Sequence, residues 1–479
     1  MGAINRGDGP EGCATRCRPC VGFLGLYLEL YDRVLPEVRG RIDAFYGTIA
    51  LEMEGRGLRV LRSPVCRLES EFREAVRGFE DAGADAIVTL HLAYSPSLES
   101  AEALAGTALP LIVLDTTPAF DYGPQQDPGE LMYNHGIHGV QDLCNLLLRS
   151  RKDFLIEAGH WQESDVLERV AAHARGAAMA SRMRLARVGS LGRPFRGMGD
   201  FQVPDQDLKR AVGLTIVRAG FEDLPGLLPP QDDPAVQAEM QADREFFDAS
   251  GLDEGVHAAT ARASIALRRW LEQERVDAFT MNFDEFRRSC GLPTIPFLEA
   301  SKAMSRGIGY AGEGDVLTAA FVSALAGVFP ETTFTEMFCP DWKGGRIFLS
   351  HMAEMNPEMA EGRARLIAKE MPWIDAETPA VAVGRFRPGR AVFANLAPGP
   401  DGTFTLIAAP VEVDGEEPDR MEGAIRGWIR PEIPVERFLE RYGEAGGTHH
   451  AALVYGDVLP EITSFGRMMR WRVEEIASA

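Results

Sequence analysis

The chain has 479 residues and a formal net charge of −21 at pH 7, with 45% hydrophobic and 25% charged residues. The charge argues against a nucleic-acid partner and against an anionic membrane surface, because both require clustered Lys and Arg. The length favours two or three domains of ordinary globular composition.

We expect neither a signal peptide nor a membrane-spanning segment in this chain. MGAINRGDGPEG lacks an apolar core, and no apolar run elsewhere approaches the roughly 20 residues that span a bilayer, so we expect a cytoplasmic protein.

Seven cysteines fit reduced thiols better than a disulfide framework. Cys13, Cys17 and Cys20 have the CxxxCxxC spacing of a [4Fe–4S] cluster in radical enzymes. Pro19 and the strand-like run that follows favour an N-terminal extension without a cluster.

The first third of the chain alternates buried strands with amphipathic helices. Strands are predicted at VGFLGLYLEL (21–30), DAIVTLHL (85–92), LPLIVLD (109–115) and KDFLIEAGH (152–160). Helical patterns lie at 73–84, 97–107 and 138–150. This order predicts a parallel α/β sheet with right-handed crossovers, whose functional residues gather beyond the carboxyl ends of the strands. His91, Tyr94 and Ser95 occupy such a position.

Two further regions follow. A helix with Ser164 as its predicted N-cap leads to strand 184–192, and strand 277–283 and helix 301–308 complete a second α/β unit. From about 331 onwards the strand-like runs are short and separated by Gly and Pro, which predicts an antiparallel sheet or barrel: 345–352, 380–386, 389–397, 402–413 and 450–457. We therefore expect three domains at 1–180, 181–330 and 331–479.

Candidate chemistry is concentrated in the last third of the chain. Glu313 lies between glycines in AGEGD, Glu336 follows TTFT, His351 follows RIFLS, and His449 and His450 follow two glycines. Each alone has a plain structural interpretation, such as a helix N-terminus, an exposed strand position, a core histidine or a turn. Two carboxylates and two imidazoles together match a divalent ion such as Mn²⁺, with positions left for a substrate.

Three blocks of the sequence resemble the L-arabinose isomerase family: NHGIHGV with AGHWQES, GYAGEGDVLTAA, and the segment from FTEMF through SHMAEMNP to GGTHHA. The resemblance implies two Rossmann-like parallel-sheet domains followed by a C-terminal antiparallel β-barrel-like domain. It implies Mn²⁺, or another divalent cation, bound by Glu313, Glu336, His351 and His450. Glu313 and Glu336 would also be the catalytic acid/base pair.

The resemblance also implies a homo-oligomer, a trimer or hexamer, with active sites at subunit interfaces. The N-terminal domain of a neighbouring subunit would complete each site. The expected substrate-binding residues are His138, His135, Tyr94, Phe283 and His449.

The sequence departs from the family pattern around the expected substrate. Cys339 and Pro340 interrupt an acidic-aromatic run, Leu28 stands where the family has glutamine, and His135 replaces another polar position. A polar pocket rejects sugars that leave buried groups unpaired. The same reaction on a different small sugar is therefore expected, with L-arabinose as one candidate.

The function predicted is metal-dependent aldose–ketose isomerisation through an enediol. Two alternatives use the same residues. A metal-dependent epimerase or lyase would share the enediolate chemistry, and a sugar-binding protein on the same fold would lack catalysis altogether.

Overall fold

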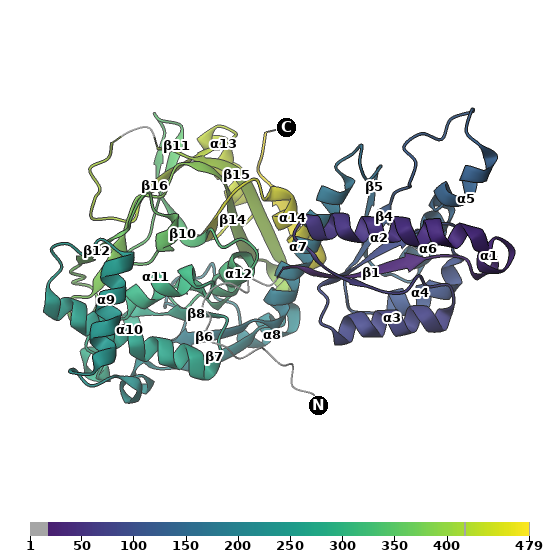
Figure 1. The fold of residues 1–479 in the computed structure, drawn as a ribbon. Coiled ribbons are helices and arrows are strands. Elements are labelled where there is room, and N and C mark those ends of the chain that lie inside the picture. Colours follow the sequence, from purple (N-terminus) through teal and green to yellow (C-terminus); the bar gives the residue numbers. More distant parts are fainter. Residues whose placement is uncertain (1–17, 416–417, 479) are drawn as a thin grey trace.

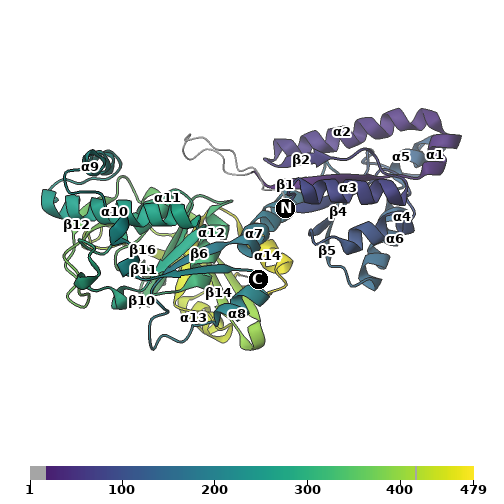
Figure 2. The same ribbon diagram turned by 90° about the horizontal axis from the view of Figure 1, so that it is seen from below.

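The computed structural model describes residues 18–415 and 418–478. An N-terminal α/β part lies to one side, and the central sheet and the C-terminal strands pack together on the other (Figures 1 and 2). None of the described helices is both long enough and apolar enough to cross a membrane.

The N-terminal part is a five-stranded parallel sheet in the order β2-β1-β3-β4-β5. Its strands are β1 (Cys20–Leu26), β2 (Arg59–Arg62), β3 (Ala86–His91), β4 (Leu111–Asp115) and β5 (Phe154–Ala158). Its helices are α1 (Glu29–Val34), α2 (Arg39–Gly55), α3 (Glu69–Asp81), α4 (Ser97–Gly106), α5 (Leu131–Asn134) and α6 (Ile137–Arg149). Strands β1 and β3 are buried along their whole length, because helices cover both faces. A Cβ at Gly22 would lie 2.3 Å from the Phe79 ring, so the packing of α3 on β1 requires glycine there.

Helix α7 (Val166–Leu185) connects this part to the rest of the molecule. It packs beneath the first sheet and against α14 (Leu459–Met468) near the C-terminus. The prediction of Ser164 as its N-cap is displaced by one residue, since Asp165 precedes the helix. The Ser164 hydroxyl still accepts a hydrogen bond from the backbone of Val166 at 3.3 Å.

The central sheet is also parallel, in the order β7-β6-β8-β9. Its strands are β6 (Arg187–Leu191), β7 (Thr215–Ala219), β8 (Ala278–Met281) and β9 (Gly309–Gly312). Its helices are α8 (Asp205–Ala211), α9 (Pro234–Phe246), α10 (Glu254–Glu274), α11 (Phe297–Ser305) and α12 (Val316–Ala326). Every residue of α12 is buried, because this helix contacts both the central sheet and the strands that follow it.

The C-terminal strands form a closed antiparallel barrel in the order β14-β17-β10-β11-β16-β15, with β15 pairing back to β14. The strands are β10 (Thr332–Asp341), β11 (Arg346–Ser350), β14 (Gly389–Pro398), β15 (Phe404–Val413), β16 (Gly427–Pro431) and β17 (His450–Tyr455). Strand β18 (Arg472–Glu475) adds in parallel to β15, and α13 (Val435–Glu444) precedes β17. The predicted fold class is confirmed. The run at 380–386 lies outside the barrel, since β13 (Ala380–Val383) pairs with β12 (Arg365–Ala368) in a separate sheet. The three domain boundaries stay a prediction.

An ion network lies where α9, α10 and α11 pack together. Glu239 accepts hydrogen bonds from Arg268 at 2.8 Å and contacts the Lys302 ammonium, while Arg268 also reaches Glu299, a residue with 0% exposure. Burial alone would raise the pKa of Glu239, but the Arg268 hydrogen bonds and the Lys302 charge lower it to about 2. The ionised form of Glu239 is therefore more favourable in the folded protein than in the unfolded chain.

Glu239→Gln should lower the free energy of unfolding at pH 7 by about 3 kcal/mol, because a pKa reduced from 4.5 to about 2 favours the folded state by that order. The contribution is complete above pH 4.5 and is lost as pH falls towards 2, so the gap between variant and wild type should narrow on acidification. Urea unfolding at pH 7, 4 and 3 measures it. The control is Glu254→Gln, whose side chain is 76% exposed and paired with Arg244, and which should change stability by less than about 1 kcal/mol. Equal effects of the two substitutions would contradict the assignment.

Candidate functional site

Glu313 lies at the carboxyl edge of the central sheet, directly after β9. Its backbone has φ of +64°, an uncommon conformation for a residue other than glycine, and the following Gly314 has φ of +86°. The strained turn is held by hydrogen bonds from the Glu313 N–H to the Met281 carbonyl and from the Phe195 N–H to the Glu313 carbonyl, both 2.8 Å. A Cβ at Gly314 would lie 2.6 Å from the Arg193 carbonyl oxygen. The sequence AGEGD therefore fixes the direction of one carboxylate.

Strand pairing in the barrel brings the other candidate residues to the same place. Glu336 in β10 lies opposite Ser350 in β11 on one side and opposite His450 in β17 on the other. His351 follows β11 directly. Cross-strand partners have neighbouring side chains. Residues more than a hundred positions apart in sequence are thus adjacent in the barrel.

The carboxylate and imidazole groups converge. His450 Nε2 lies 3.1 Å from Glu336 Oε1 and 3.4 Å from Glu313 Oε2, and His351 Nε2 lies 3.7 Å from Glu336 Oε1. His449 Nε2 lies 3.5 Å from Glu313 Oε2. One ligand atom from each of Glu313, Glu336, His449 and His450 falls within 4.8 Å of the others, a grouping that could hold a metal ion.

The two buried histidines each have a carboxylate that orients the ring. His450 Nδ1 lies 2.9 Å from Asp315, which also caps α12, and His351 Nδ1 lies 2.7 Å from Glu354. The Tyr310 hydroxyl donates to Glu354 at 2.5 Å. Such partners fix the tautomer and orientation of metal-binding imidazoles.

The Nε2 atoms of His351 and His450 are buried and make no hydrogen bond of acceptable geometry with any residue that the structure describes. Unsatisfied buried polar atoms are rare in folded proteins. Both rings are oriented with Nε2 towards the glutamates. The donor set, two carboxylates and two imidazole nitrogens, fits a divalent transition-metal ion.

His449 differs from its neighbour. Its side chain is 36% exposed, and its Nδ1 lies 2.7 Å from Asp200, a residue of the loop after β6. Phe201 stacks on His450, with ring centroids 4.9 Å apart, so the same loop covers one side of the cluster. Residues 200 and 201 therefore form part of the wall of the site.

Both glutamates are ionised at neutral pH. Burial raises the pKa of Glu313, but the close approach of the His449 and His450 rings and the charges of His450 and His351 outweigh burial and lower it to about 2. For Glu336 burial likewise raises the pKa, and the charges of His351 and His450 bring it below its ordinary value. Ionised carboxylates are the form needed both to bind a cation and to accept a proton.

The remaining predicted residues fall in two places. Phe283, half-buried after β8, packs on Phe195 with ring centroids 5.5 Å apart, beside the Glu313 turn. Tyr94, His135 and His138 form a separate aromatic cluster, with His138 at 6.5 Å from Tyr94 and 6.1 Å from His135 between ring centroids. This cluster lies around α5 and α6, which both views place at the far end of the N-terminal part from the barrel (Figures 1 and 2).

Several residues of the site escaped sequence analysis. Glu354 lies three positions after His351, and Asp315 two after Glu313, so acidic residues close to predicted ligands were a usable signal. Asp200 gave no signal, because 249 positions separate it from His449.

Of the three cysteines in the CxxxCxxC motif, the structure describes Cys20 alone, and Cys20 is not part of this site. Cys20 is the first residue of β1 and is buried, and burial raises the pKa of its thiol. Cys13 and Cys17 lie outside the described residues. The described cysteines are free thiols: Cys20, Cys66, Cys144, Cys290 and Cys339.

Comparison with known proteins gives consistent results. Residues 212–329 match the family model for the L-arabinose isomerase central domain, and residues 331–472 match that for the C-terminal domain. The L-arabinose isomerase of Nocardioides sp. is 28% identical over 83% of this chain and 81% of its own length. That of Herpetosiphon aurantiacus is 25% identical over 70% of this chain and 69% of its own length.

A solved structure also aligns, the periplasmic binding protein component of an arabinose ABC transporter from Shewanella sp. ANA-3. It is 12% identical, covers 64% of this chain and 85% of its own, and has a TM-score of 0.15, too low to bear on the fold. The two family models together cover more than half of the sequence and include Glu313, Glu336, His351 and His450. The chain belongs to the L-arabinose isomerase family and is an aldose–ketose isomerase.

Proposed function

We propose that this isomerase is Mn²⁺-dependent and that Glu313, Glu336, His351 and His450 bind the ion. The observation that carries this proposal is the pair of buried, unsatisfied Nε2 atoms facing two ionised glutamates. It also favours His351 over His449 as the fourth ligand. His449 is partly exposed and is not among the unsatisfied buried groups.

The two glutamates supply the proton transfers. Converting an aldose to a ketose requires removal of a proton from carbon and transfer of a hydroxyl proton, through an enediol of the sugar. When bound, a divalent ion supplies Lewis-acid stabilisation to the charge that develops on the sugar oxygens. One of Glu313 and Glu336 takes the carbon-bound proton, and the other moves the hydroxyl proton. Asp315 and Glu354 hold the two histidines in place while this happens.

His449 and Phe283 shape the substrate side of the site. His449 is oriented by Asp200 at the exposed side of the cluster, where its Nε2 is positioned to contact a sugar hydroxyl. Phe283 with Phe195 provides an apolar wall beside the Glu313 turn. Apolar walls position a sugar by contact with its C–H faces and exclude water.

His138, His135 and Tyr94 contact the substrate of a neighbouring subunit in this proposal, within a cytoplasmic trimer or hexamer. Two observations support it. Among residues 18–415 and 418–478 of one chain, Tyr94, His135 and His138 contact one another and Tyr31, and not the glutamates or histidines of the cluster. On the barrel side, Phe338, two residues after Glu336 in β10, and Trp342, just beyond the end of β10, are 46% and 64% exposed, as expected of aromatic residues that a second protein surface covers.

The substrate is a small sugar, and L-arabinose is one candidate. Cys339 is exposed just after an irregularity in the β10–β11 register between Met337 and Cys339. The departures from the family pattern thus include positions on the strand that carries Glu336, and they change the surroundings of the sugar without changing the glutamates and histidines.

The deciding experiment is product identification. Protein stripped of metal and reloaded with Mn²⁺ is incubated in D₂O with pentoses, hexoses and deoxy-sugars. We expect a ketose that carries carbon-bound deuterium taken from the solvent in place of the proton that was removed. No turnover is expected before Mn²⁺ is added. A C2 epimer or two smaller fragments would replace the proposal by epimerase or lyase chemistry. Sugar binding without any product would leave a binding protein.

A further inference from the structure

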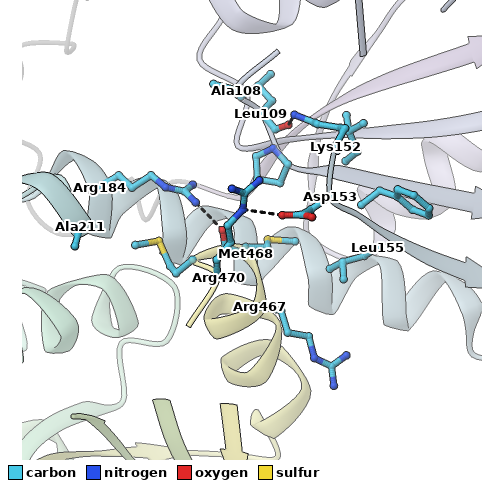
Figure 3. Close-up of a pocket in the computed structure, with 14 residues that line it drawn as sticks. Ala108, Leu109, Lys152, Asp153, Leu155, Arg184, Ala211, Arg467, Met468 and Arg470 are labelled. Carbon is cyan, nitrogen blue, oxygen red and sulfur yellow. Dashed lines mark hydrogen bonds and ion pairs between the residues drawn. The ribbon is translucent and has the colours of Figure 1, made fainter. Parts of the chain in front are cut away.

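A cavity away from the glutamates lies where the N-terminal part meets the rest of the molecule (Figure 3). It has a volume of about 400 Å³ and is lined by the segments that lead into β4 and β5, the end of α7 and the end of α14. It opens at the amino ends of the first sheet, opposite the edge that carries Tyr94 and His138.

The cavity gathers cations in a chain that is strongly acidic overall. Lys152, Arg184 and Arg470 surround it, and Arg467 belongs to the lining but points away from the other three in Figure 3. Asp153 is the only carboxylate of the lining, all of whose residues the structure describes. The lining therefore carries a clear excess of positive charge.

Two of the four cations, Lys152 and Arg184, bind backbone carbonyls rather than carboxylates. Lys152 Nζ donates to the Thr107 and Leu109 carbonyls at 2.5 and 3.1 Å, and Arg184 donates to the Met468 carbonyl at 2.6 Å. Arg470 is ion-paired with Asp153 at 2.6 Å, and Arg467 lies 3.9 Å from Glu475, which is outside the lining. A backbone carbonyl accepts a hydrogen bond from a cationic side chain but does not neutralise its charge.

Helix ends account for part of the excess. The carboxyl ends of α7 and α14 both point at the cavity, and each carries about half a negative charge. Asp153 and the two helix ends together offset about two of the three converging cations. About one positive charge remains, without counting Arg467, which is paired with Glu475.

The cations also affect one another. Burial lowers the pKa of Lys152, and the Arg470 charge lowers it further. The same two causes, in the same order, lower the pKa of Arg184. Arg470 itself has φ of +58°, an uncommon conformation for a residue other than glycine. This residue ends α14 in a left-handed cap: its N–H donates to the Arg467 carbonyl and the Trp471 N–H donates to the Gly466 carbonyl, both at 3.0 Å, so the helix end sets the direction of the Arg470 side chain.

We propose that this cavity binds a dianionic phosphate group, either of a small phosphorylated sugar or as free phosphate. Guanidinium forks and an ammonium are the donors that bind phosphate most strongly. Leu109, Pro110 and Leu155 supply an apolar side against which the carbon skeleton of a sugar phosphate packs. The volume is suited to a small ligand.

The position of the cavity gives such a ligand a structural effect. Lys152 belongs to the N-terminal part, Arg184 to the helix that connects it, and Arg470 to the segment after α14. One phosphate held by all three joins these segments. Binding should therefore raise the unfolding temperature of the whole chain.

The test uses the full-length protein in excess EDTA, so that no ligand binds through a metal ion. Calorimetric titration with ribose 5-phosphate, inorganic phosphate and ribose should show one phosphate-dependent site per chain and no binding of ribose. Tighter binding of ribose 5-phosphate assigns the site to a sugar phosphate, and equal affinities assign it to free phosphate. Saturation by ribose itself, or no saturation by either phosphate below about 10 mM, would overturn the proposal.

Variants separate binding from folding. Lys152→Met and Arg184→Gln should each weaken phosphate binding about tenfold or more, while Arg77→Gln, an exposed cation on α3, should leave it unchanged. Asp153→Asn should tighten binding severalfold, because it removes the competing carboxylate. A purely structural role for the cluster predicts no tightening in Asp153→Asn. That result, with melting temperatures of the free variants close to wild type, would refute the proposal.

Discussion

Glu313→Gln is expected to reduce kcat by at least about a thousandfold while the fold is retained. The substitution keeps the size of the side chain but removes a charge from the cluster and a proton acceptor from the sugar. Glu313 is held by backbone hydrogen bonds at both its N–H and its carbonyl, so its side chain leaves the turn in a fixed direction. Ketose formation with Mn²⁺ present measures the loss, and elemental analysis measures retained metal.

The matched control is Glu331→Gln. Glu331 precedes the same strand as Glu336, but its side chain is 57% exposed and paired with Arg387. It should retain wild-type turnover and metal content. Turnover of Glu313→Gln within tenfold of wild type would remove Glu313 from the proton transfers, whatever its metal content.

The parallel sheets were predictable because buried parallel strands are continuous apolar runs. The strand and helix predictions at 85–92, 97–107 and 109–115 correspond to β3, α4 and β4. The barrel was predictable only as a class, since its strands are short and their partners are set by distant contacts. The run at 380–386 has the same pattern as a barrel strand, yet it pairs with β12. Local sequence does not specify which sheet a short strand joins.

The candidate site was predictable in composition but not in geometry. Glycines beside Glu313 and the paired histidines identified residues worth attention, and register explains why they meet. Glu336 faces His450 because β10 pairs with β17, which no spacing in the sequence reveals. The sequence also does not show which of the histidines lie closest to the glutamates. His449 was expected to bind substrate, yet its Nε2 approaches Glu313 as closely as His450 does, at 3.5 against 3.4 Å.

Mixing two impaired variants tests directly whether a site is shared between subunits. His138 is exposed in the first turn of α6, so His138→Ala should fold normally and lower kcat/KM by about a hundredfold. Co-expressed with Glu313→Gln, it should recover far more activity than either variant alone. In a mixed oligomer about a quarter of the sites receive His138 from one chain and Glu313 from the other, both intact.

A site built within one chain predicts the opposite, because every site would then contain one of the two defects and activity would not exceed that of His138→Ala. The control pair is Glu313→Gln with Glu336→Gln. Both glutamates lie in the same cluster of a single chain, His450 Nε2 being within 3.4 Å of each carboxylate, so mixing cannot produce an intact pair. Recovery in the first mixture and none in the second requires that the residues around α6 act on the glutamates of another subunit. The cluster around α6 and the glutamates are then separated within one chain because each active site is assembled from two subunits.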